Sequence, residues 1–112
     1  KMDMNAEEVK KRIKQNKFVT NNGMVLRAAN TLREKYVALT ELSYALEPSM
    51  TESELTDCLN YLSRSGYIEL RDIRTHEVKY LSDADFEELE TILTPNGIKL
   101  LNGRKNDECI SI

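Results

Sequence analysis

The apolar residues of this chain change their spacing at Gly66, and this change limits what the chain can fold into. Before Gly66 they recur every three or four residues, which is the period of a helix with one buried face. After it, in the segment 67–73, apolar and polar residues alternate, which is the period of a strand with one buried face. The sequence therefore predicts helices followed by a small sheet, in a single domain of 112 residues.

The helix before Gly66 has sequence signals at both ends. Thr51 and Glu54 have the spacing of a capping box, in which each side chain bonds an unpaired amide of the first turn. Ser65 and Gly66 supply a left-handed cap at the other end. We therefore predict a helix from Thr51 to Ser65. Its apolar positions follow the i, i+3, i+4, i+7 pattern and are Leu55, Cys58, Leu59 and Leu62.

Three further helices are predicted upstream. The first covers residues 5–17 and carries a narrow apolar stripe, and a turn is expected at Asn21-Asn22-Gly23. The second is expected from Met24 to Lys35 and the third near Leu39 to Leu46. The apolar positions of the three helices are Met2, Ala6, Val9 and Ile13, then Val25, Ala28, Ala29, Leu32 and Tyr36, then Leu39, Leu42, Ala45 and Leu46.

A hairpin is expected after Gly66, with Ile68 and Leu70 on the buried face of its first strand. Thr94 and Pro95 are a cap residue and a proline at the first helical position, so they predict a last helix. The predicted segments are a strand at 67–73, a turn at 74–77, a return strand at 78–81, a helical turn at 82–88, a strand at 89–93 and a helix at 96–101. The residues after Gly103 show no pattern.

Two segments resemble the winged helix-turn-helix superfamily. Leu59–Ile68 is similar to the junction of recognition helix and wing in bacterial regulators, and Leu93–Leu101 is similar to the turn that closes the wing. The resemblance spans about Met24 to Leu101 and implies an α+β fold, mainly α with a small β-wing, plus an extra amino-terminal helix. The predicted divisions are a basic amphipathic helix and linker at 1–21, a winged-helix domain at 22–102 and a tail at 103–112. The wing also resembles small winged-helix proteins of Mu-like prophages, which implies a bacterial or prophage origin.

In the DNA-reading members of that superfamily the helix Thr51–Ser65 would enter the major groove. DNA affinity comes largely from Lys and Arg that neutralise phosphates, yet residues 50–66 have a net charge of −2 and the whole chain −3. Acids in a first helical turn also have a purely structural explanation, because they complement the helix dipole. The residues expected on the outer face are Glu52, Ser53, Glu54, Thr56, Asp57, Asn60, Ser63 and Arg64.

Two functional hypotheses remain open. In the first, a regulator contacts DNA phosphates through the wing and the basic amino-terminal helix, since residues 1–17 have a net charge of +3. In the second, the acidic helix face docks a basic protein partner or a second copy, and the amino-terminal stripe also fits dimerisation. The candidate DNA-binding residues are Lys10, Lys11, Lys14, Arg71, Arg74 and Lys79, and the candidate partner-binding residues are Glu52, Asp57 and Asn60.

Neither a catalytic residue nor a cofactor or metal site is expected. His76 is the only histidine and stands in a predicted turn, where no serine or cysteine is placed to use it as a base. The acidic stretch 82–88 lacks the glycine and glutamate of an EF-hand loop. Cys58 and Cys109 with one histidine make neither a zinc site nor a disulfide framework, and Cys58 is expected to be a buried core thiol.

Membrane-spanning and secretory segments are also not expected. No apolar run approaches the roughly 20 residues that cross a bilayer, and residues 1–4 lack the apolar core of a secretion signal. We therefore expect a cytoplasmic protein. Whether Lys1–Asp3 are native residues or a remnant of a tag stays open, because Met2 and Met4 could each start the chain.

Overall fold

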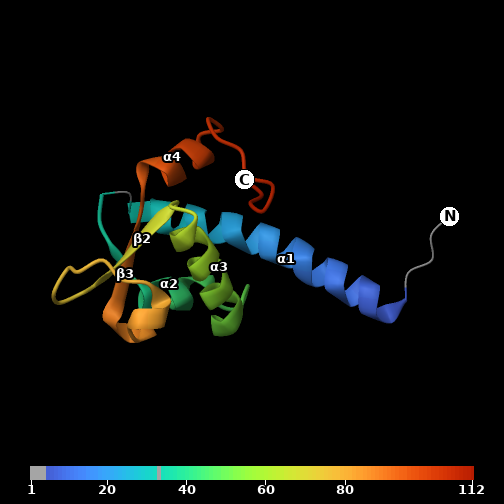
Figure 1. Cartoon of the computed structure of the whole chain (residues 1–112), viewed down its shortest axis with the longest axis horizontal. Helices are drawn as coiled ribbons and strands as arrows, with labels where there is room; N and C mark the ends of the chain where they lie inside the picture. Colours follow the sequence, from blue (N-terminus) through green and yellow to red (C-terminus); the bar gives the residue numbers. More distant parts are fainter. Residues whose placement is uncertain (1–4, 33) are drawn as a thin grey trace.

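The computed structural model describes residues 5–32 and 34–112, which form a mixed α+β fold of four α-helices and one antiparallel sheet (Figure 1). This confirms the predicted α+β class. The elements in chain order are α1 (Ala6–Ala29), η1 (Asn30–Leu32), β1 (Val37–Ala38), α2 (Leu39–Leu46), α3 (Glu52–Arg64), β2 (Ile68–Asp72), η2 (Leu81–Asp83), η3 (Phe86–Glu88), β3 (Leu89–Leu93) and α4 (Pro95–Leu101).

Helix α1 is continuous for 24 residues where two helices were predicted. The predicted turn at residues 21–23 is wrong, since all three residues are helical and buried, and the predicted boundary between residues 21 and 22 falls inside the helix. A stripe at i, i+4, i+7 and i+11, formed by Phe18, Asn22, Val25 and Ala29, runs through this segment toward the core. Burial of that stripe outweighs the local turn preference of Asn-Asn-Gly.

The second predicted helix ends earlier than expected. Helix α1 stops at Ala29 and is followed by the 3₁₀ turn η1. Tyr36, which the pattern placed on the helical stripe, instead precedes β1, and its hydroxyl donates a hydrogen bond to the Glu69 carboxylate. The positions predicted for Met2 and for the side chain of Leu32 lie outside the described residues.

The carboxy-terminal segment packs across α1 and explains the glycine within the helix. A Cβ atom built at Gly23 would lie 1.8 Å from the carbonyl oxygen of Ser111. The Asn22 side chain donates a 3.0 Å hydrogen bond to the carbonyl oxygen of Cys109, and Ile110 is buried in the core. The tail, for which the sequence showed no pattern, therefore belongs to the folded domain.

Helices α2 and α3 lie where they were predicted, and the capping box is present. The Glu54 amide donates to the Thr51 hydroxyl at 3.1 Å, and the Thr51 amide donates to the Glu54 carboxylate at 2.9 Å. Gly66 has a φ of 80°, as a left-handed cap requires. These local signals were read correctly because they act within a few residues.

Two predicted side-chain positions on these helices are wrong. Ala45 was expected to face inward, but it is exposed, because α2 meets the core only through Leu39, Leu42 and Leu46. Ser63 was expected on the outer face of α3, but it is buried. Helix α3 contacts both α1 and β2, so more of its circumference is covered than a single stripe provides.

The sheet has the strand order β1-β3-β2, with both pairs antiparallel. In β2, Ile68, Leu70 and Asp72 are buried, which confirms the alternation. The predicted return strand at 78–81 is wrong, since only one bridge joins Val78 to Arg71, and the partner of β2 is β3. Val78 is exposed, so the first residue of the segment 78–81 places no apolar side chain in the core. In β3, by contrast, every second residue is buried, as in a strand with one face on the core. The predicted helical turn at 82–88 consists of the short turns η2 and η3.

Replacing Gly23 with alanine is expected to destabilise the full chain by about 1–3 kcal/mol, because the added methyl group displaces the Ser111 backbone from α1. Urea denaturation followed by circular dichroism measures this change. In a chain that ends at Asp107 the same substitution should instead stabilise by up to about 1 kcal/mol, since alanine is the better helix former. Stabilisation in both chains would contradict the packing of the tail on Gly23.

Candidate functional site

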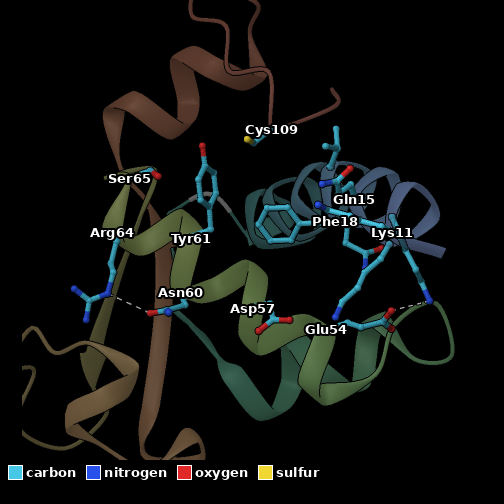
Figure 2. A pocket seen from close by; sticks show the side chains of 14 residues that line it. Lys11, Gln15, Phe18, Glu54, Asp57, Asn60, Tyr61, Arg64, Ser65 and Cys109 are labelled. Atoms are coloured by element: carbon cyan, nitrogen blue, oxygen red, sulfur yellow. Dashed lines mark hydrogen bonds and ion pairs between the residues drawn. The ribbon is translucent and has the colours of Figure 1, made fainter. Parts of the chain in front are cut away.

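A groove of about 840 Å³ lies between α1 and α3 (Figure 2). Phe18 of α1 and Tyr61 of α3 form its apolar floor, with ring centroids 5.6 Å apart in an edge-to-face arrangement. Cys109 of the carboxy-terminal segment lies beside the two rings. Three segments that are far apart in the sequence therefore build one hollow.

Helical spacing places the groove residues on facing sides of the two helices. Lys11, Lys14 and Phe18 are at i, i+3 and i+7 on α1, so they lie on one face. Asp57 and Tyr61 are at i and i+4 on α3 and likewise share a face. The two faces meet because the second half of α1 packs against α3 and the first half continues past it (Figure 1).

The two rims of the groove carry opposite charges. The α1 rim holds lysines, and the α3 rim holds Glu54 and Asp57. One ion pair spans the rims, with Lys17 Nζ 2.7 Å from Glu54 Oε2. This hydrogen bond, together with that from the Thr51 amide, lowers the pKa of Glu54. The site thus combines an apolar floor with charged rims.

Arg64 lies at the other end of the α3 rim. Its Nε donates a 3.3 Å hydrogen bond to Asn60 Oδ1, and its guanidinium lies 4.6 Å from the ring centroid of Tyr80. These contacts tie α3 to the segment that follows the hairpin. Arg64 therefore orders the α3 rim.

A carboxylate behind the floor holds the tail in place. Asp107 accepts hydrogen bonds from the hydroxyl groups of Tyr61 at 2.8 Å and Tyr67 at 2.7 Å, and from the Cys109 amide at 2.8 Å. Burial on its own raises the pKa of Asp107, but these hydrogen bonds outweigh burial and the pKa is lowered. Burial and the bond to Asp107 raise the pKa of Tyr67 to about 12.

The two thiols have different surroundings. Burial in the core raises the pKa of Cys58 to about 12, so this thiol stays protonated and unreactive. Cys109 is only partly buried and lines the groove. The prediction of a buried core thiol at Cys58 is confirmed.

Two of the candidate DNA-binding residues in the hairpin have partners within the chain. Arg71 donates a 2.6 Å hydrogen bond to Glu90, and its guanidinium lies 3.4 Å from the ring centroid of Tyr36. Lys79 lies 3.9 Å from the Glu77 carboxylate.

Arg74, the third hairpin candidate, is exposed in the turn, and Lys10, Lys11 and Lys14 are exposed on α1. The hairpin and the free end of α1 lie toward opposite ends of a molecule 55 Å long (Figure 1). A single chain therefore does not gather the six candidate cations on one surface.

Of the candidate partner-binding residues, Asp57 and Asn60 line the groove, whereas Glu52 does not. Lys11, predicted as a DNA contact, lies on the opposite side of the groove (Figure 2). Lys14, also predicted as a DNA contact, lines the groove from the same helix. Sequence reasoning missed Phe18, Tyr61 and Cys109. For Phe18 a signal existed, because the spacing from Phe18 through Asn22 to Val25 continues the core stripe across the predicted turn.

Comparisons with protein-family models, with curated proteins and with solved structures find no match to this chain. Among the helices of the described residues, none is both long enough and apolar enough to cross a membrane. Within residues 5–32 and 34–112, His, Cys, Asp and Glu form no group of three that could hold a metal ion.

Replacing Asp107 with asparagine is expected to lower the free energy of unfolding by roughly 1–3 kcal/mol at neutral pH, because two hydroxyl groups and an amide lose a charged acceptor. The pKa of Asp107 is lowered in the folded state, so its contribution is complete above the unfolded pKa near 4 and is lost as the pH falls through the folded value. Urea denaturation of both chains should show a difference that shrinks below about pH 4. A difference independent of pH would contradict this role of the carboxylate.

Proposed function

We propose that this chain is a non-enzymatic winged-helix protein that binds another protein, and that an amphipathic helix of the partner docks in the groove between α1 and α3. The observation that carries the proposal is the combination of an apolar floor with rims of opposite charge. Two of the three residues chosen from the sequence as partner contacts, Asp57 and Asn60, belong to that groove.

The order of the elements supports the winged-helix part of the proposal. Helices α2 and α3 follow one another as in a helix-turn-helix, and the antiparallel pair β2–β3 with its long loop follows as a wing. The short strand β1 pairs with the edge of β3 that β2 leaves free. Helix α4 follows β3 directly in the chain. Helix α1 supplies the first helix of such a domain together with an amino-terminal extension.

The chemistry of the groove favours a helix as the occupant. An amphipathic helix binds by laying an apolar face into a groove, while its flanking side chains meet the rims. Here that face would cover Phe18 and Tyr61. Acidic side chains on one flank would approach Lys11 and Lys14, and basic side chains on the other would approach Asp57.

DNA binding remains the second candidate, and the exposed lysines of α1 are the observation that favours it. Phosphate contacts need accessible cations. In the hairpin, Arg71 is already paired with Glu90 and stacked on Tyr36. On α3 the predicted reading face carries Asp57. These charges favour a protein partner over DNA.

Duplex DNA provides the first test. Fluorescence anisotropy with a labelled duplex at about 50 mM salt, where phosphate binding is strongest, should show no association at micromolar protein. A salt-sensitive association that is lost in Arg74→Glu and Lys10→Glu, two exposed cations, would favour the DNA hypothesis and count against the protein-binding one.

Selection from a displayed library of random helical peptides provides the second test, because it does not presuppose the partner. Selected peptides should be amphipathic, and Asp57→Lys should weaken their binding by about tenfold, as expected for a central contact. The matched control is Glu41→Lys on α2, which reverses an exposed acid outside the groove. Equal binding to both variants would exclude the groove as the docking site.

A further inference from the structure

The first half of α1 projects away from the body of the protein (Figure 1). Every residue from Asn5 to Lys17, hereafter the arm, is exposed. Most of the arm surface is therefore available to a partner. A partner that packs on one face of the arm would also stabilise it, because an isolated helix of this length is marginal in water.

An apolar stripe runs along the arm, formed by Ala6, Val9 and Ile13 at the a, d and a positions of a heptad. Val9 is 39% exposed and Ile13 is 62% exposed. Val9 and Ile13 each stand two residues before a groove residue, Lys11 and Gln15 respectively. Two residues correspond to a rotation of about 200° around a helix, so the stripe lies on nearly the opposite face of α1 from these groove residues. The stripe is thus a separate surface from the groove.

Two basic residues flank the stripe, Lys10 at an e position and Arg12 at a g position, while Asn5 at the other g position is neutral. Lys17 also falls at an e position, but its ammonium group is paired with Glu54 across the groove. These positions set partner choice in paired helices, because they meet the flanks of the opposing helix. The acids Glu7 and Glu8 lie farther round the helix, at b and c, and do not offset the flanking charge.

This charge arrangement disfavours pairing with a second copy of the chain. Residues 5–17 carry five basic and two acidic side chains, so pairing two copies would lay one positively charged arm against another in either a parallel or an antiparallel orientation. The apolar stripe fits dimerisation, but this repulsion between the arms opposes it.

We propose that the stripe binds an acidic amphipathic helix of a different protein, with apolar residues at its a and d positions and Glu or Asp at its e and g positions. Such a helix buries Val9 and Ile13 and pairs its acids with Lys10 and Arg12. A lipid surface fits less well, because membrane-bound helices present a broad face rich in Trp, Phe or Leu, and residues 5–17 contain none of these.

The test uses a labelled synthetic peptide of about four helical turns with leucine at a and d and glutamate at e and g. When the full chain is added, the fluorescence anisotropy of the labelled peptide should rise and its helix content should increase. The affinity of the peptide for the chain should fall as the salt concentration rises. The matching peptide with lysine at e and g should bind at least about tenfold more weakly.

Variants place the contact on the chain. Ile13→Asn should weaken binding of the acidic peptide by about tenfold, as expected when an apolar anchor is lost. The matched control is Val78→Asn, because Val78 is also β-branched and is 63% exposed. This variant should bind the acidic peptide as the unchanged chain does. Asp57→Lys in the groove should also bind normally, so failure of the stripe proposal can be told from failure of the groove proposal.

Several results would overturn the proposal. Equal affinity for the two peptides, no association of the acidic peptide, or binding that depends on Asp57 but not Ile13 would each do so. A reversible dimer in sedimentation that Ile13→Asn abolishes would assign the stripe to a second copy. Flotation with vesicles containing about a third phosphatidylserine, also lost in Ile13→Asn, would assign it to an anionic lipid surface.

Discussion

Burial of the second half of α1 is the interaction on which the rest of the structure depends. This half contacts α2, α3, α4 and β3, and Val25 and Leu26 are fully buried. Each partner element is short and amphipathic, and elements of this length gain most of their stability from packing. The tail crosses the same helix at Gly23, where the lack of a side chain lets its backbone approach closely. A single helix therefore organises the helices, the sheet and the carboxy terminus.

Because α1 continues past the body, one helix serves two purposes. Its second half is core, whereas its first half is the exposed arm (Figure 1). The groove exists because α1 leaves the body of the protein before α3 is fully covered. Phe18, the first residue after the arm, therefore meets Tyr61 of α3 at the edge of the core. The same geometry leaves the opposite side of the arm uncovered. A partner can thus approach α1 from either side without disturbing the core.

The charges of the chain are arranged differently on its two halves. In the hairpin, Arg71 is paired with Glu90 and stacked on Tyr36, so its charge stabilises the sheet. On the arm, Lys10, Lys11 and Lys14 are exposed. Net charge alone, at −3 for the whole chain, conceals this division. A basic arm on an acidic body suits partners that carry negative charge on an amphipathic surface.

The sequence by itself determined the features that depend on a few neighbouring residues: the capping box at Thr51, the left-handed cap at Gly66 and the helix that begins at Pro95. It also placed Asp57 and Asn60 on the outer face of α3, since a helical face follows from spacing. Only the tertiary structure decided that α1 is continuous, that β2 pairs with β3, and that Phe18 and Cys109 complete the groove. These features arise from burial against segments distant in the chain, and that energy outweighs local preferences such as the turn tendency of Asn-Asn-Gly.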